Sequence, residues 1–247
     1  MILENYGNQY INAILFDMNG TLRIRVPHEP TQSSAIARFL DLLGKTEASD
    51  VFWEEISKSY RQYNSWAQEN QLQLSEKEIW TRWLLPGFPC EQVEPVAEEL
   101  TIAFKERKGH CIPVIGAYEV LVELKQRGYL LGLVSNSVSS LDIPRSLEAF
   151  GWNELFHTVI LSSTVKSRKP SPEIFLEATR SLNLDPTHCA YLGNRISRDI
   201  VGCKRAGFAL GILIEPHDKP HPGEKDQKIQ PDVIITSLSE LLALFPG

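Results

Sequence analysis

The stretch I-N-A-I-L-F-D-M-N-G-T-L-R-I-R, residues 11–25, decides the fold of this chain. Its apolar run from Ala13 to Phe16 stops at Asp17, and a tight turn at Gly20 follows. Continuous apolar runs are typical of parallel strands that are buried on both faces. Ligands bind beyond the carboxyl ends of such strands, so we expect Asp17 to point into a binding crevice. The alternative, on this stretch alone, is that Asp17 only caps the turn through local hydrogen bonds.

Length and composition describe an ordinary globular protein. The chain has 247 residues, 43% hydrophobic and 23% charged, which allows one large domain or two modest ones. Its formal net charge of −6 at pH 7 gives no general attraction to nucleic acid. Without a membrane-length apolar run or a signal sequence, we expect a cytoplasmic protein that binds neither membrane nor nucleic acid. The four cysteines lack paired spacing and are expected to be reduced thiols.

Residues 26–108 carry apolar stripes at helical spacing and predict an all-helical domain of three to four helices. Ser75 and Glu78 form the pattern of a capping box, which marks the start of one of these helices. The two prolines in Val26–Pro30 predict a non-helical connector that acts as a hinge. The aromatic residues are expected to form a small core, with one or two of them lining a substrate pocket. The candidates for that pocket are Trp53, Tyr60, Tyr63, Trp80 and Trp83.

Beyond the helical segment, short apolar runs alternate with amphipathic helical patterns. The strands predicted there are Leu130–Val134, Thr158–Leu161, Cys189–Leu192, Leu210–Ile214 and Val233–Ile235. This alternation predicts right-handed crossovers and an α/β, Rossmann-like parallel sheet with helices on both faces. The core domain is then discontinuous, with residues 1–25 and 109–247 on either side of an inserted helical cap domain, 26–108.

Further polar residues stand where predicted strands end or where helices begin. Ser135 ends one strand, Lys169 precedes a helix, and Gly193 with Asn194 ends another strand before Asp199. Taken singly, the serine can be a cap, the lysine a solvated charge and the aspartate a helix N-terminal residue. Because the carboxyl ends of parallel strands meet at one edge of the sheet, we expect these residues to gather around one crevice.

Taken together, Asp17–Thr21, Ser135, Lys169 and Gly193–Asp199 resemble the four motifs of the haloacid dehalogenase-like hydrolase superfamily. The resemblance extends to the helical cap that some members insert after the first strand. It implies that Asp17 is a nucleophile that attacks phosphorus to give an aspartyl-phosphate. It also implies that Lys169 stabilises Asp17 and the charge that develops on the phosphoryl group.

The same resemblance implies a Mg²⁺ cofactor and a small anionic substrate, bound by a monomer or a homodimer. The residues implied to hold the metal are Asp17, Asn19 through its backbone carbonyl, Asn194 and Asp199. The residues implied to bind the substrate or its phosphoryl group are Gly20, Thr21, Arg23, Ser135 and Asn136.

Two positions depart from the family pattern. Most phosphatases of the family carry Asp at the position of Asn19, where it protonates the leaving group and later activates water. An amide cannot exchange that proton, a role that is typically worth about 10²–10⁴ in rate. Asn194 also stands where a metal-binding Asp is usual, and an amide oxygen binds Mg²⁺ without contributing charge. We therefore expect slow turnover and weakened metal affinity.

Three functions fit these residues. A Mg²⁺-dependent phosphatase is favoured. A metal-free 2-haloacid dehalogenase-like hydrolase is the first alternative, because Asp is absent at position 19 and a Ser-Asn pair stands at 135–136. The cations available for its carboxylate substrate and halide product are Arg23, Arg25, Arg195 and Arg198. A catalytically impaired binding protein that keeps the fold is the second alternative.

Overall fold

A computed structural model describes residues 10–215 and 228–247, so the sequence-based expectation for the N-terminus lies outside the described residues. At its centre is a six-stranded parallel sheet with the order β5-β4-β1-β6-β7-β8. The bounds are β1 Ala13–Phe16, β4 Leu130–Ser135, β5 Thr158–Leu161, β6 Cys189–Gly193, β7 Leu210–Ile214 and β8 Val233–Ile235. Strand β1 lies between β4 and β6, and Phe16 pairs with Leu133 on one side and Leu192 on the other.

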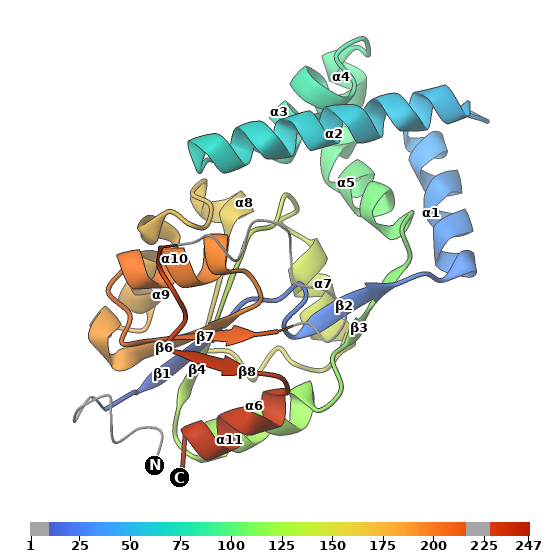
Figure 1. Ribbon diagram of the computed structural model, residues 1–247. Helices are drawn as coiled ribbons and strands as arrows, with labels where there is room; N and C mark the ends of the chain where they lie inside the picture. The colour runs from blue at the N-terminus through green and yellow to red at the C-terminus, as the bar shows by residue number, and fades with distance from the viewer. Residues whose placement is uncertain (1–9, 216–227) are drawn as a thin grey trace.

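Helices cover both faces of the sheet (Figure 1). One face carries α6 (Ala117–Gln126), α7 (Asp142–Ala149) and α11 (Leu241–Leu244), and the other carries α9 (Pro172–Ser181) and α10 (Val201–Arg205). Ile14 and Phe16 pack on the first layer, whereas Ala13 and Leu15 pack on the second. All four side chains have no exposed surface, which explains why this strand is continuously apolar. The predicted α/β, Rossmann-like sheet with helices on both faces is confirmed.

Residues 29–106 form the segment that we call the helical insert. Its elements are α1 Glu29–Leu42, α2 Asp50–Asn70, α3 Glu76–Ile79, the π-helical turn Trp80–Leu84, α4 Cys90–Val93, the 3-10 turn Glu94–Val96 and α5 Ala97–Glu106. Ser75 and Glu78 make the predicted capping box at the start of α3. The insert has its own core, in which Trp80 is 1% exposed and donates a hydrogen bond to Thr101 at 2.7 Å.

The prolines that open the insert do not prevent helix formation. The connector expected over Val26–Pro30 is wrong at its end, because α1 begins at Glu29 with Pro30 in its first turn. Proline fits there because its missing N–H has no partner within a helix, and the side chain of His28 caps the backbone N–H of Thr31.

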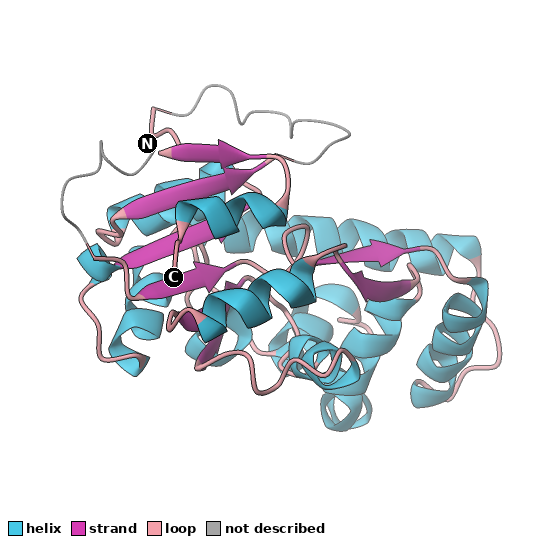
Figure 2. Cartoon of the chain, turned by 90° about the horizontal axis from the view of Figure 1, so that it is seen from below, coloured by secondary structure: helices cyan, strands magenta, loops and turns pink. Residues whose placement is uncertain are grey.

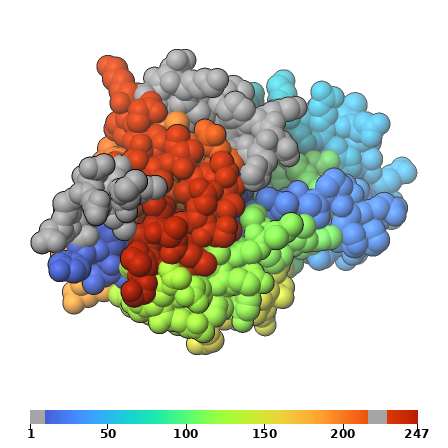
Figure 3. Space-filling view, turned by 60° about the horizontal axis from the view of Figure 1, so that its bottom comes forward, coloured from blue at the N-terminus to red at the C-terminus, as the bar shows by residue number. Residues whose placement is uncertain are grey.

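A two-stranded antiparallel ribbon links the helical insert to the sheet region. It consists of β2 (Arg23–Val26) and β3 (His110–Pro113), neither of which was predicted as a strand. Figure 2 shows the ribbon apart from the six-stranded sheet, on the side where the insert lies. In Figure 3 the cyan residues of the insert stand to one side of the red and green residues of the sheet region. The proposed domain borders at 25/26 and 108/109 fall within or beside this ribbon, and the division itself stays a prediction.

The remaining described elements are short. They are α8 Ser162–Val165, the 3-10 turns Pro186–His188 and Leu238–Glu240, and the π-helical turn Ile196–Ile200. All four cysteines are free, as the sequence predicts. In the part of the chain that the structure describes, no helix has both the length and the apolar character needed to cross a membrane.

Candidate active site

The side chain of Asp17 leaves the carboxyl end of β1 and is 4% exposed. Its Oδ1 accepts hydrogen bonds from the Ser135 hydroxyl at 3.3 Å and from the Lys169 ammonium at 2.7 Å. Ser135 is the last residue of β4, the neighbouring strand, and Lys169 lies just before α9. Three residues that are far apart in the sequence therefore meet at one edge of the sheet, as expected.

Lys169 is enclosed by oxygen atoms and is 1% exposed. Besides Asp17, its ammonium pairs with Asp199 Oδ1 at 2.6 Å and donates to the Val134 carbonyl at 3.0 Å. The Tyr191 hydroxyl lies 2.8 Å away and donates to the same carbonyl at 2.9 Å. An ammonium group has three protons to donate, so these partners fix its position between two buried carboxylates.

The protonation of Asp17 is set by opposing effects. Burial raises the pKa of this carboxyl, and the nearby Asp199 carboxylate raises it further, whereas the Lys169 ammonium lowers it. The net pKa of Asp17 is raised above its usual value. Because Asp17 is buried away from water, its anionic form is stabilised mainly by the Lys169 ammonium.

Replacing Lys169 by methionine is expected to lower the free energy of unfolding by about 3–5 kcal/mol, because two buried carboxylates lose their counter-charge. The loss should shrink as the pH falls, since the pKa of Asp17 is raised and this carboxyl can then take up a proton in the folded state. Urea unfolding at several pH values measures this. The matched Lys58→Met variant, at an exposed position on α2, should unfold like the wild type at every pH; an equal loss in both variants would contradict the assignment.

Asp199 is turned toward Lys169 and its own loop. Its Oδ2 accepts from the Arg195 backbone N–H at 3.0 Å, so both carboxylate oxygens have partners within the chain. A Cβ atom at Gly193 would overlap this carboxyl group, and one at Gly20, where φ is +83°, would overlap the Asn194 amide. These glycines allow the turns after β1 and β6 to approach each other closely.

Where the turns after β1 and β6 lie close together, two buried side-chain oxygens have no hydrogen-bond partner among the described residues. They are Asp17 Oδ2 and Asn194 Oδ1. Unsatisfied buried oxygens are costly, and carboxylate and amide oxygens are ligands that Mg²⁺ accepts. The described residues contain no group of three His, Cys, Asp or Glu side chains that could hold a metal ion. Mg²⁺ commonly binds through one or two carboxylates together with substrate phosphate and water. Asp17 Oδ2 and Asn194 Oδ1 therefore fit a Mg²⁺ site in which the protein supplies little negative charge.

The other predicted substrate ligands occupy different places. Asn136 lines the cavity and is tied to the Lys169 backbone, accepting from its N–H at 2.8 Å and donating to its carbonyl at 3.1 Å. Thr21 is 1% exposed, and its hydroxyl lacks a hydrogen-bond partner within the described residues. Gly20 is exposed in the turn beside Asn194.

Arg23 is not placed to touch a ligand in the cavity, and its assignment as a substrate-binding residue is corrected. Its side chain has no exposed surface; it pairs with Asp142 at 2.5 Å and contacts the Ser146 hydroxyl. Its Nε donates to Asn19 Oδ1 at 3.0 Å, so Arg23 instead orients the amide at the position of the expected general acid. Arg25, two residues on, lines the cavity.

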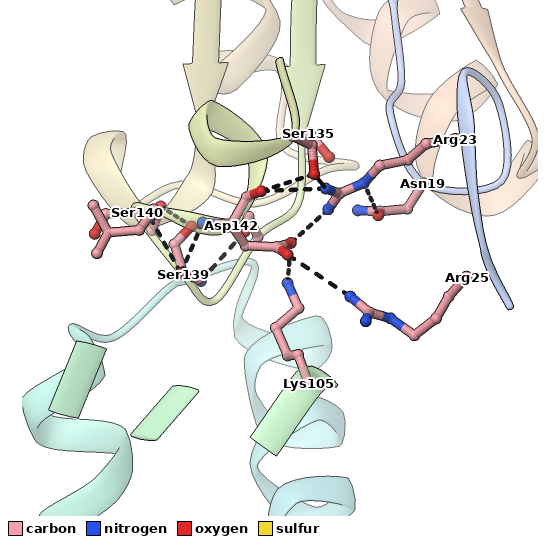
Figure 4. Close-up of polar contacts among 12 residues, drawn as sticks. Asn19, Arg23, Arg25, Lys105, Ser135, Ser139, Ser140 and Asp142 are labelled. Carbon is pink, nitrogen blue, oxygen red and sulfur yellow. Dashed lines mark hydrogen bonds and ion pairs between the residues drawn. The ribbon is translucent and has the colours of Figure 1, made fainter. Parts of the chain in front are cut away.

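Asp142 joins the sheet region to the helical insert. Figure 4 shows Arg23, Arg25 and Lys105 pointing toward its carboxylate. Lys105, from α5 of the insert, lies 2.5 Å from Asp142, and Arg25 lies 3.7 Å from it. Burial alone would raise the pKa of Asp142, but Lys105 and Arg23 outweigh it and hold this pKa well below its usual range. Three cations thus share one anion.

The cavity next to Asp17 has a volume of about 260 Å³ and lies between the sheet region and the insert. Its lining residues are Asp17, Asn19, Arg25, Tyr60, Asn64, Lys105, Asn136, Ser137, Val138, Arg168, Lys169 and Arg198. Tyr60 is the one residue of the predicted aromatic set among them. Lys105 on α5 and Asn64 on α2 were not among the residues predicted from the sequence. Arg168 was overlooked, although its place beside Lys169 in the sequence was a usable signal.

Comparison with known proteins supports this fold and identifies the family. The sequence model of the haloacid dehalogenase-like hydrolases matches residues 11–207. Glyceraldehyde 3-phosphate phosphatase from Methanopyrus kandleri is 26% identical over 201 residues, covering 80% of this chain and 82% of the relative. Phosphoglycolate phosphatase from Nitrosococcus oceani is 29% identical over 161 residues, covering 64% and 68%. A 2-haloacid dehalogenase from Pseudomonas syringae shares the fold, with a TM-score of 0.67, 22% identity and coverage of 95% and 97%.

The family match spans both the helical insert and the four groups of residues around Asp17. The chain therefore belongs to the haloacid dehalogenase-like hydrolase family, and it is a hydrolase.

Proposed function

We propose that this hydrolase is a Mg²⁺-dependent phosphatase that acts on a small phosphorylated metabolite through a phosphorylated Asp17. The observation that carries the proposal is the Asp17 carboxylate, which lines the cavity and has Ser135 and Lys169, both on Oδ1, as its hydrogen-bond donors among the described residues. A carboxylate held in this way at the end of a rigid strand is oriented for attack. Relatives named as phosphatases support phosphorus as the atom attacked.

In this proposal the hydrolysis of the phosphate ester proceeds in two steps at Asp17. In the first, an oxygen of Asp17 forms a bond to phosphorus while the bond from phosphorus to the substrate oxygen breaks. In the second, water attacks the phosphorylated aspartate, releasing inorganic phosphate and restoring the carboxylate. The Lys169 ammonium and the Ser135 hydroxyl donate hydrogen bonds to the charge that develops on the transferred group. Asn136 keeps Lys169 in place through its two backbone hydrogen bonds.

Asp17 Oδ2, the amide oxygen of Asn194 and the Asn19 carbonyl would hold Mg²⁺, which would supply positive charge against the negative charge of the phosphoryl group. Asp199, which the resemblance implied as a further metal ligand, has a different role in this proposal: its oxygens are paired with Lys169 and the Arg195 N–H, and it supports the site through Lys169. With a single carboxylate among the direct donors, we expect weak Mg²⁺ affinity.

Leaving groups that need no proton should be preferred. Asn19 cannot protonate a departing alkoxide, so the proton comes from water and alkyl phosphates react slowly. The leaving groups of aryl and acyl phosphates, an aryloxide and a carboxylate, depart as stable anions. These phosphates are therefore the expected good substrates.

The test is an assay of phosphate release from an aryl phosphate and an acyl phosphate, with Mg²⁺ and after its removal with a chelator. We expect activity that disappears on chelation and returns when Mg²⁺ is added in excess. Activity that persists in the chelator would contradict the metal assignment. Inactivity toward both substrates at saturating Mg²⁺ would contradict the proposed function.

Carbon–halogen hydrolysis is the second candidate, because the cavity offers the cations Arg25, Arg168 and Arg198 to a carboxylate substrate and a halide product. It is distinguished by measuring halide release from a 2-haloacid in the presence of the chelator. Metal-independent halide release without phosphatase activity would replace the first candidate by the second.

A further inference from the structure

The cavity carries more positive charge than a single phosphoryl group can neutralise. Among the described residues, six cations and three carboxylates line it or stand directly behind the lining, which leaves a net charge of +3. The cations are Arg23, Arg25, Lys105, Arg168, Lys169 and Arg198, and the carboxylates are Asp17, Asp142 and Asp199. A bound phosphoryl dianion removes two of these charges, and a bound Mg²⁺ adds two.

Two of the positive charges stand at Arg168 and Arg198. Lys169 is paired with Asp17 and Asp199, and Arg23, Arg25 and Lys105 share Asp142. In contrast, neither Arg168 nor Arg198 forms an ion pair within the described part of the chain; Arg198 acts on Asp17 from beyond ion-pair distance and lowers the pKa of that carboxyl. The Nε atoms of both guanidinium groups are buried and lack a hydrogen-bond partner among these residues.

Arg168 is built into its position. It is 6% exposed, and its Nη1 donates to the Gln73 side chain of the insert at 2.5 Å. Its backbone N–H donates to the Gln71 carbonyl at 3.0 Å, and Leu72 pairs with Ser167 as an antiparallel bridge. Burial lowers the pKa of Arg168, Tyr63 and Tyr60 raise it, and the positive charge of Arg198, which lines the same cavity, lowers it further. A buried, unpaired guanidinium is costly unless an anion joins it.

We propose that Arg168 and Arg198 form a second anion subsite, so that the substrate carries a carboxylate or a second phosphate in addition to the phosphoryl group at Asp17. Both arginines line the same cavity as Asp17, and Tyr60 and Asn64 of α2 close it from the insert. Guanidinium groups bind carboxylate and phosphate oxygens in a forked geometry. As an assignment of substrate class, the inference rests on the proposed function.

The test uses phosphonates, whose carbon–phosphorus bond this chemistry does not break, so binding is measured without turnover. Calorimetry with the full chain and Mg²⁺ compares propylphosphonate, which has a neutral tail, with phosphonopropionate and ethylene bisphosphonate. We expect the last two to bind at least about tenfold more tightly, as charge-assisted hydrogen bonds to a subsite predict. Whichever of these two ligands binds more tightly shows whether the second anionic group of the substrate is a carboxylate or a phosphate.

The variants Arg168→Gln and Arg198→Gln should each weaken the two-anion ligands about tenfold to hundredfold, and much more than they weaken propylphosphonate. Arg180→Gln removes an equal charge at an exposed position on α9 and should leave all three affinities unchanged. Arg168 also donates a hydrogen bond to Gln73, so Arg168→Gln can impair folding. In that case the affinities of Arg198→Gln for the three ligands test the subsite.

Equal affinities for the three ligands, or a preference that survives in Arg198→Gln, would overturn the subsite. Failure of the proposed function is a separate result: no phosphate ester is hydrolysed, yet the preference for two anions and its loss in the variants remain.

Discussion

Asp17→Asn is expected to lower kcat for aryl phosphate hydrolysis on the order of 10⁴-fold or more, because the amide cannot form the phosphorylated intermediate. The fold should persist, since Lys169 keeps its ion pair with Asp199 at 2.6 Å. Steady-state kinetics with purified protein measures the loss. The matched acid-to-amide change, Asp185→Asn, lies at an exposed turn and should retain full activity.

The same variant has a signature in stability. Folding raises the pKa of Asp17, and a group of this kind contributes stability at low pH that is lost as the pH rises through its folded-state pKa. Asp17→Asn removes this loss, so its free energy of unfolding should fall less than that of the wild type as the pH rises from the usual aspartate range toward neutrality. Turnover close to that of the wild type, in a folded variant, would refute Asp17 as the nucleophile.

Asn19→Asp is expected to raise kcat for alkyl phosphates by about 10²-fold, the lower end of what general acid–base catalysis supplies. The lower end applies because Arg23 Nε, 3.0 Å from the Asn19 side-chain oxygen, would stabilise the new carboxylate and lower its pKa. A carboxyl that is mostly ionised at neutral pH seldom has a proton to donate. The rate of the variant should therefore increase as the pH falls toward the pKa of the new carboxyl. Rates for alkyl and aryl phosphates measured from acid to neutral pH check this.

The control for that gain is Asn153→Asp, which adds the same charge at an exposed turn and should not change the rate. Aryl phosphates should gain less than alkyl phosphates, since their leaving groups need no proton. A gain of the same size for both substrates, or no gain for either, would show that proton transfer at position 19 does not limit turnover.

The sequence was sufficient where local pattern determines structure. The apolar run Ala13–Phe16 forms β1 with these bounds, and the capping box of Ser75 and Glu78 begins α3. The group at Asp17 was also predictable, because parallel strands bring their carboxyl ends to one edge of the sheet.

Long-range electrostatics was not predictable from the sequence. Arg23 and Asp142 are 119 residues apart, and no local pattern shows that one would hold the other at 2.5 Å. Consequently Arg23 was assigned to the substrate, although its charge is used within the protein. The ribbon of β2 and β3 was missed for a related reason: each strand has only four residues, and both become strands by pairing with each other, from Arg23 with Pro113 to Val26 with His110.

The backbone bridge between Leu72 and Ser167 joins the helical insert to the loop that carries Lys169. The hydrogen bonds on either side of it, from Gln73 to Lys166 at 2.9 Å and from Arg168 to Gln71 at 3.0 Å, end one residue before Lys169. The insert cannot swing away from the sheet without breaking them. The contacts that hold the insert against the sheet region therefore adjoin, along the chain, the lysine that pairs with Asp17.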